Sequence, residues 1–266
     1  MSAPRAIIIT GASSGIGAAL AVHYAAPGVA LGLLGRDAAR LEAVASAVRG
    51  RGAVVETGRV DMREAEAVAG WIARFDAAHP VDLLIANAGV LEGRDEDGRI
   101  EDYEVAARVI GINLLGSLAA LHAVLPSMRA RGCGQIALVS SLAAFSPLTD
   151  APAYGASKAG LLSYGLAMRA ALEGTGVGVS VVCPGYVASA MTETHIGEQP
   201  MKLSAAAAAR LIATGLARGR AVIGFPRALY IGSLISSVIP ERLRLYFTRS
   251  MRFHVATRRS GDDGAP

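Results

Sequence analysis

The amino-acid sequence predicts an α/β fold, with a doubly wound parallel sheet of about seven strands and helices on both faces. Apolar, β-branched runs alternate along the chain with Ala- and Leu-rich stretches of helical length, which is typical of βαβ units in a parallel sheet. Several strand runs are apolar throughout, as expected when helices cover both faces of the sheet.

The predicted elements follow one another without a repeat or a linker. The apolar runs predict strands over 5–10, 29–34, 53–60, 82–86, 134–140, 177–183 and 221–225. The stretches between them predict helices over 15–26, 37–50, 63–78, 101–131, 152–174 and 204–218. We therefore expect one domain over 1–226, a basic C-terminal extension over 227–260 that is no independent domain, and a disordered end over 261–266.

The charge of the chain lies at its C-terminal end. Residues 227–260 hold seven arginines and one acidic residue, whereas 1–226 hold 19 basic and 19 acidic residues. A neutral domain of this kind argues against nucleic acid as a partner. The 266 residues are 52% hydrophobic and only 18% charged, which excludes a disordered chain.

The two cysteines, Cys133 and Cys183, have no metal-ligand spacing. We therefore predict no metal site, and so few cysteines fit a reducing, cytoplasmic location. The N-terminal residues do not resemble a signal peptide, and no uninterrupted apolar run reaches about 18 residues, so we expect no transmembrane helix.

A glycine-rich turn, TGASSGIG over 10–17, follows the first strand and opens the first helix. Glycines permit a tight turn and a close approach of the backbone to a pyrophosphate. The helix start offers free N–H groups and the positive end of its dipole to the phosphates. The turn therefore predicts a Rossmann-type nucleotide site, with an ordinary glycine-rich turn as the alternative.

The second strand ends at Gly35-Arg36-Asp37. An acidic residue about 20 positions after the glycines would bind the ribose 2′-OH of NAD, whereas an arginine accommodates a 2′-phosphate. Arg36 lies 19 residues past Gly17, so we expect NADP(H) to be preferred, with NAD(H) as the second choice. Asp37 is better explained as the N-cap of the next helix. Asp61, after the third strand, would accept from an adenine amino group, cap the next helix, or do both.

Tyr154 and Lys158 are four residues apart in a predicted helix and so share a face. A nearby ammonium favours a phenolate, which would lower the pKa of Tyr154 from its usual value of about 10. A tyrosine tuned in this way can exchange a proton with a carbonyl or alcohol oxygen. Lys158 is one of only two lysines in the chain, which strengthens the prediction.

These motifs resemble the short-chain dehydrogenase/reductase family, in its short single-domain subgroup. They occur over about residues 5–226 in the family's order, as the turn at 10–17, Asp61, Asn87-Ala88-Gly89, Asn113, Ser141, YxxxK at 154–158, and Pro184-Gly185. Ala86 replaces the first asparagine of the family's NNAG segment, and Ser189 replaces its usual threonine.

The resemblance implies a role for each matched residue. Tyr154 would be the general acid/base, Lys158 would lower its pKa and hold the nicotinamide ribose, and Ser141 would bind the substrate carbonyl. Asn113 would hold a water of the proton relay, with packing at a helix kink as the alternative. The other implied cofactor contacts are Gly11, Ser13, Ser14, Gly15, Ile16, Gly17, Met62, Asn87, Ala88, Gly89, Pro184, Gly185, Val187 and Ser189.

The function implied is reversible carbonyl reduction or alcohol oxidation by hydride transfer, with reduction favoured by NADPH. Residues 142–153 are mostly apolar and lack arginine and lysine, so we expect a small lipophilic carbonyl or alcohol substrate. An epimerase or dehydratase relative is an alternative, against which the glycine spacing and chain length argue. A non-catalytic nucleotide-binding sensor or scaffold is another, against which the complete Asn113, Ser141, Tyr154 and Lys158 set argues.

The extension predicts two short amphipathic helices, one over 229–239 and one beyond Pro240. Two interpretations stand for it: packing over the substrate cleft or a subunit partner, or peripheral contact with an anionic membrane. The helices over 101–131 and 152–174 are apolar on several faces. The family resemblance implies that they pair between subunits, so we expect a homodimer or homotetramer.

Overall fold

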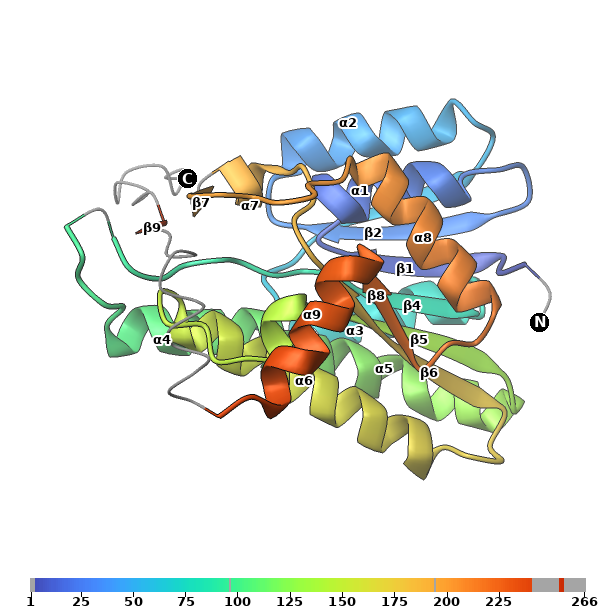
Figure 1. Cartoon of the computed structure of the whole chain (residues 1–266). Helices are drawn as coiled ribbons and strands as arrows, with labels where there is room; N and C mark the ends of the chain where they lie inside the picture. The colour runs from blue at the N-terminus through green and yellow to red at the C-terminus, as the bar shows by residue number, and fades with distance from the viewer. Residues whose placement is uncertain (1–2, 96, 194, 241–253, 256–266) are drawn as a thin grey trace.

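The computed structural model describes residues 3–95, 97–193, 195–240 and 254–255. At its centre is a parallel sheet with the strand order β3-β2-β1-β4-β5-β6-β8 (Figure 1). Its strands are β1 (Ala6–Thr10), β2 (Ala30–Gly35), β3 (Val54–Arg59), β4 (Leu83–Ala86), β5 (Gly134–Val139), β6 (Val177–Pro184) and β8 (Val222–Phe225). The predicted doubly wound parallel sheet is confirmed, and each of the seven predicted strands overlaps one of these.

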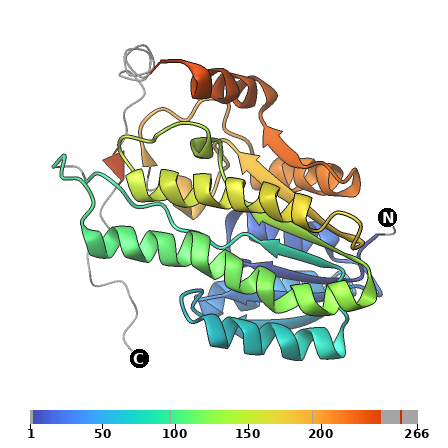
Figure 2. The ribbon, with the colours of Figure 1, turned by 90° about the horizontal axis from the view of Figure 1, so that it is seen from below.

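Helices cover both faces of the sheet. The helices are α1 (Gly15–Tyr24), α2 (Ala38–Arg49), α3 (Ala65–Ala78), α4 (Tyr103–Ile110), α5 (Gly116–Arg131), α6 (Pro152–Ala171), α7 (Ala190–Glu193), α8 (Ala205–Ala217) and α9 (Arg227–Val238). Helices α1, α2 and α8 pack on one face, above the sheet in Figure 1. Helices α3, α5 and α6 lie side by side on the other (Figure 2).

Strand β1 shows why the strand sequences have apolar residues at successive positions. All five of its residues are buried. Ile8 belongs to the core under α3, α5 and α6, whereas Ile7 and Ile9 belong to the core under α1, α2 and α8. Successive side chains of a strand point to opposite faces, so a strand covered on both faces has apolar residues on both. The one polar residue, Thr10, lies at the end of β1.

Local capping explains where three helices begin. The side chains of Asp37, Asp102 and Ser204 each accept a hydrogen bond from the backbone N–H three residues on, at 2.9, 2.8 and 3.2 Å. Side-chain caps of this type satisfy N–H groups that have no partner within the helix. The predicted capping role of Asp37 is confirmed.

The helix predicted over 101–131 is observed as one rod, Tyr103–Arg131, that contains a π-helical turn at Gly111–Leu115. By length and composition this rod could span a membrane, but half of its most apolar stretch is buried. Val109, Leu121 and Met128 are fully buried within the domain. The rod is thus a core helix, whose apolar character comes from packing on the sheet.

The C-terminal extension begins with α9, which is the first of the two predicted amphipathic helices. The second lies within 241–253, and the end predicted to be disordered lies within 256–266; both are outside the described residues. Strand β9 (His254–Val255) pairs antiparallel with β7 (His195–Ile196), in the loop between β6 and α8. The extension therefore returns to the segment that follows β6.

Candidate active site

The loops after β1 and β4 meet where the strand order reverses, which is the usual place for ligands in such sheets. The Asn87 amide nitrogen donates to the carbonyl oxygens of Thr10 and Gly11 at 3.1 and 3.2 Å. The hydroxyl of Thr10 accepts from the backbone N–H groups of Asn87 and Ala88, both at 3.0 Å. Asn87 thus fixes the glycine-rich turn against the end of β4.

The glycine-rich turn has no room for side chains. Gly11 and Gly15 have φ angles of +66° and +56°, and a Cβ on Gly15 would lie 2.9 Å from the Cβ of Ser189. A Cβ on Gly17 would lie 2.3 Å from the carbonyl oxygen of Gly11. Ser14 occupies the N-cap of α1 but makes no side-chain capping bond, so the first N–H groups of α1 stay available to a phosphate. This cradle fits the pyrophosphate of a dinucleotide.

A shallow pocket lies at the ends of β2 and β3, lined by Arg36, Arg59, Val60 and Asp61. Arg59 sits directly opposite Gly35 in the strand register, so two arginines border this pocket. A Cβ on Gly35 would lie 3.3 Å from the Ser13 Cβ, so the glycine-rich turn contacts the end of β2 next to this pocket. The pocket is where the adenosine ribose would lie in this fold.

Asp61 does not cap helix α3, whose N-cap is Glu64. Its carboxylate instead accepts from the backbone N–H of Arg63 at 2.9 Å and from its guanidinium at 2.7 Å. These bonds hold the pKa of Asp61 below its usual value. Next to it, Met62 is buried, and a Cβ on Gly116 would lie 2.6 Å from its carbonyl oxygen.

The residues proposed for proton transfer come from β5 and α6. Ser141 follows β5, and its hydroxyl accepts from the backbone N–H of Ala143 at 3.1 Å. Lys158 is buried, and its Nζ donates to the carbonyl oxygen of Val139 at 2.9 Å while lying 5.7 Å from the centroid of the Tyr154 ring. Ser141, Tyr154 and Lys158 are therefore brought together as the sequence predicted.

The pKa of Tyr154 shifts in the direction opposite to the prediction. Burial raises it, and this outweighs the lowering by the Ser141 hydroxyl. Burial also lowers the pKa of Lys158 to about 8. Both shifts have one cause, since a low-dielectric environment disfavours the charged phenolate and the charged ammonium alike.

Asn113 lies fully buried in the π turn. Its side-chain oxygen accepts from the N–H of Val90 at 2.8 Å, and its amide nitrogen donates to the carbonyl of Val90 and to the hydroxyl of Ser157 at 3.0 and 3.1 Å. The side chain thus makes the packing contacts of the alternative interpretation. A Cβ on Gly89 would lie 3.2 Å from Asn113 Oδ1 and 3.3 Å from Lys158 Nζ, so all three residues adjoin.

The segment after β6 lies beside the glycine-rich turn. The Gly185 N–H donates to the carbonyl of Phe225 at 2.8 Å, and Val187 is buried and bridges to Leu203. The backbone N–H of Ser189 donates to the hydroxyl of Thr192 at 3.0 Å. With Pro184 at the end of β6, this segment reaches from the sheet to Gly15, as expected for a wall of the cofactor site.

The family model for short chain dehydrogenases matches residues 5–199. The chain belongs to this family. An uncharacterized oxidoreductase of Myxococcus xanthus is 37% identical to this dehydrogenase over 240 residues, covering 90% of the chain and 94% of that protein. A protein of Arabidopsis thaliana named 11-beta-hydroxysteroid dehydrogenase-like 4A is 31% identical, covering 90% of the chain and 82% of that protein.

The solved structures agree with the family assignment. A short-chain dehydrogenase from Sphingobium yanoikuyae, in complex with NADPH, is 25% identical with a TM-score of 0.76, covering 98% of each chain. The dehydrogenase is therefore an oxidoreductase of CH–OH and C=O groups that uses a nicotinamide cofactor.

Two residues near the site of the dehydrogenase were missed by sequence reasoning. Arg59 could have been found from the strand register, since it ends β3 beside Gly35 on β2. Glu101 accepts a hydrogen bond from the Ala153 N–H at 2.5 Å, 52 residues away, and no local pattern signals it.

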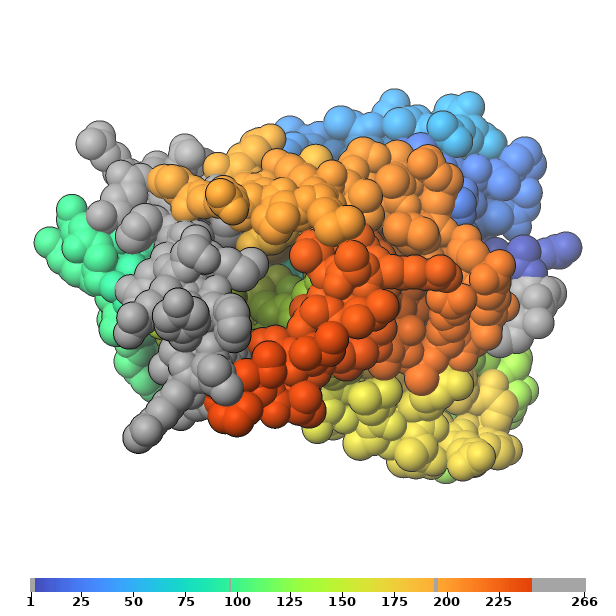
Figure 3. All heavy atoms as spheres, viewed as in Figure 1, coloured from blue at the N-terminus to red at the C-terminus, as the bar shows by residue number. Residues whose placement is uncertain are grey.

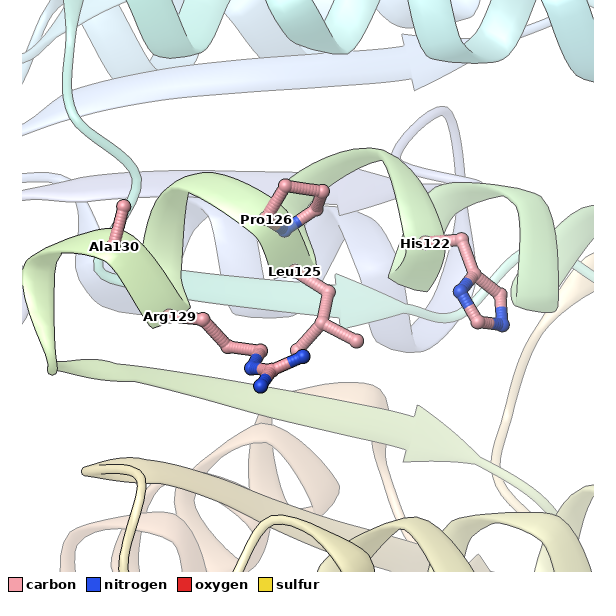
Figure 4. Close-up of a pocket in the computed structure, with 5 residues that line it drawn as sticks. All are labelled: His122, Leu125, Pro126, Arg129 and Ala130. Carbon is pink, nitrogen blue, oxygen red and sulfur yellow. The ribbon is translucent and has the colours of Figure 1, made fainter.

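A second pocket lies along α5, apart from these residues, lined by His122, Leu125, Pro126, Arg129 and Ala130 (Figure 4).

Proposed function

We propose that this dehydrogenase reduces lipophilic ketones or aldehydes with NADPH. The observation that carries the proposal is the meeting of Ser141, Tyr154 and Lys158 beside Gly89, at the edge of the sheet where the glycine-rich turn lies. When bound, the cofactor supplies the hydride. The protein binds and orients the cofactor and the substrate, and it transfers the proton.

The cofactor would be held by groups along the whole edge of the sheet. The first N–H groups of α1 would bind the pyrophosphate, supported by Gly11, Ser13, Ser14 and Ile16. Arg36 and Arg59 would bind a 2′-phosphate, which favours NADP(H) over NAD(H). The family resemblance suggests further contacts. Asp61 and Met62 would contact adenine. The segment 87–89 and Lys158 would contact the nicotinamide ribose, and Pro184, Gly185, Val187 and Ser189 would contact the carboxamide.

Tyr154 would act as the proton donor. Because burial raises its pKa, the phenol keeps its proton at neutral pH and can give it to a carbonyl oxygen that gains negative charge. The Ser141 hydroxyl would donate a hydrogen bond to the same oxygen. Lys158, with a pKa of about 8, is mostly an ammonium at pH 7 and would stabilise the phenolate left behind. This pairing supports reduction as the direction.

The substrate side of the site is apolar. Leu142 and Cys183 are buried and pack with Phe145 and Tyr230, and a second small cluster joins Leu148 to Tyr154. Residues 142–153 contain no arginine or lysine that would pair with a phosphate or carboxylate. The name of the Arabidopsis relative, which refers to a hydroxysteroid, supports the same class of substrate.

The decisive variant is Tyr154→Phe, assayed with NADPH on ketosteroids, long-chain ketones and aromatic aldehydes. Loss of the proton donor should lower kcat/KM by about 10²- to 10⁴-fold. Tyr164→Phe is the matched control, because Tyr164 lies on the same helix and binds His122. Near wild-type turnover by Tyr154→Phe would refute the assignment. Turnover of no carbonyl by the wild type would favour the sensor or scaffold alternative.

A further inference from the structure

Helix α9 carries an apolar stripe on its solvent side. Ile231, Leu234, Ile235 and Val238, here called the α9 stripe, are between 40% and 80% exposed. Their spacing of three and four residues places them on one face of the helix. Single exposed aliphatic residues are common, but four that line one face indicate a surface that another apolar surface covers.

The opposite side of α9 fixes the direction in which the stripe faces. The ring of Tyr230 packs edge-on against Phe145, with 5.6 Å between centroids. It also fills the space beside Gly224, where a Cβ would lie 2.4 Å from the ring. The hydroxyl of Ser146 donates to that of Ser236 at 3.0 Å. Helix α9 is therefore fastened to the 142–146 segment, with its stripe outward.

The position of α9 places the stripe next to the substrate side of the site. In Figure 3, α9 runs across the viewed face of the molecule beside a hollow. The 142–146 segment that supports α9 follows directly on Ser141. A surface that covers the stripe would therefore also lie close to the apolar wall of the substrate site.

The charge of the sequence around the stripe selects its partner. No acidic residue occurs in α9, and residues 227–260 hold seven arginines against the single Glu241. Two copies of so basic a segment would repel each other, whereas anionic headgroups would attract it. An apolar helix face in a sequence segment rich in arginine is typical of helices that lie in the interface of an anionic membrane.

We infer that the α9 stripe docks on an anionic lipid surface, to which the net positive charge of the 227–260 sequence attracts it. Docking would turn the apolar wall at 142–146 towards the bilayer. A lipophilic carbonyl compound dissolved in the membrane would then reach the site without crossing water; this last step rests on the proposed function.

Co-sedimentation of the full chain with vesicles tests the docking. Vesicles of phosphatidylcholine with phosphatidylglycerol should pull the protein down, and vesicles of phosphatidylcholine alone should not. Binding should weaken as salt screens the arginines, since the screening length falls from about 10 Å at 0.1 M to about 3 Å at 1 M. Ile235→Glu should lower the partition coefficient about tenfold or more, because an isoleucine no longer enters the interface.

Val54→Glu is the matched control for Ile235→Glu. Val54 is 54% exposed and Ile235 56%, but Val54 is on β3, at the opposite edge of the sheet. Val54→Glu should bind the anionic vesicles like the wild type. Turnover of a water-soluble carbonyl should be the same in all three proteins, so the docking result does not depend on the proposed activity.

Three outcomes would overturn the inference. The first is equal recovery of the wild type in the supernatant with and without anionic vesicles. The second is loss of a dimer in Ile235→Glu while vesicle binding stays unchanged, which would make the stripe a contact between copies. The third is a lower Tm of Ile235→Glu without vesicle binding by the wild type, which would assign the stripe to packing against 241–253.

Discussion

Tyr154 and Lys158 show how one environment sets two proton affinities. Burial raises the pKa of the phenol and lowers that of the ammonium to about 8. At neutral pH both groups therefore still carry their protons. A rise in pH would remove the proton from Lys158 before that of Tyr154, so the residue that stabilises the phenolate is the first to lose its charge.

The arginine pair at the adenosine pocket predicts cofactor choice. Arg36→Ala and Arg59→Ala should each lower kcat/KM with NADPH by about tenfold to a hundredfold, since a charged hydrogen bond contributes about 1.5–3 kcal/mol. The values with NADH should change little, because the 2′-phosphate is missing. Steady-state kinetics with both cofactors give the ratio of kcat/KM with NADPH to kcat/KM with NADH for each variant.

Arg49→Ala is the control for this pair, because Arg49 is exposed at the far end of α2. A fall that is equal for NADPH and NADH in the Arg36 and Arg59 variants would contradict a 2′-phosphate contact. Both arginines are exposed, so their loss should leave the folded state intact.

Single residues were predictable where their role is local. Asp37 could be assigned as a cap from its place before a helix, and its bond to the Arg40 N–H confirms this. Asp61 stands in a similar position, but a guanidinium two residues on competes for its carboxylate. The direction in which the pKa of Tyr154 shifts was not predictable, because it depends on burial by distant segments.

At the scale of elements, the start of α6 depends on a distant side chain. The N-cap residue is Ala151, which offers no side-chain acceptor. The Glu101 carboxylate caps the helix instead, because it accepts a hydrogen bond from the backbone N–H of Ala153, next to Tyr154. Nearby, the Arg94 guanidinium contacts the buried Asp150 carboxylate at 3.0 Å. The loop before α4 thus holds the helix that carries Tyr154.

Glu101→Ala should therefore destabilise the protein by about 1–2 kcal/mol, the usual cost of losing a cap. Glu101→Gln keeps an acceptor oxygen and should lose less. Glu104→Ala, on the exposed side of α4, serves as the control. Denaturant unfolding followed by circular dichroism gives the free energies. Equal stability of Glu101→Ala and the wild type would show that α6 needs no such cap.

The π turn at Gly111–Leu115 marks the limit of prediction for elements. Period and composition predicted one helix over 101–131, and that extent is nearly correct. The interruption arises where Asn113 bonds to Val90, 23 residues earlier in the chain. Such a contact exists only after folding. An asparagine among apolar residues of a helix could indicate a kink at Asn113, but it could not identify Val90 as the partner.

At the scale of the whole molecule, the outer surface of α5 and α6 supports a subunit contact. Leu115 and Leu166 are exposed there, and His122 and Tyr164 join the two helices at 2.7 Å. The pocket of Figure 4 opens on the same surface of α5. An apolar surface beside a pocket can receive side chains of a second copy.

We therefore expect light scattering to give twice or four times the 27.2 kDa of the chain. Leu166→Glu should shift the mass towards the monomer, because a charge would be buried without a partner. Leu211→Glu, at an exposed position of α8, should not. A mass of one chain for the wild type at micromolar concentration would contradict the contact.

The whole fold was predictable because its signals repeat along the chain. Seven apolar runs and the helices between them leave few topologies, and the glycine-rich turn locates the ligand edge. The position of the C-terminal extension in the fold was not predictable in the same way. Its first helix has a clear pattern, but the pairing of β9 with β7 joins segments about sixty residues apart.

That pairing bears on how the dehydrogenase can diversify. Backbone groups make the contacts between β7 and β9, and backbone pairing places few demands on side-chain identity. Residues of the loop after β6 can therefore change to suit another substrate while the loop stays tied to the end of the chain. Shortening the chain before β9 would remove that tie at once. Relatives that differ in length here should then differ in substrate range more than relatives that differ in sequence alone.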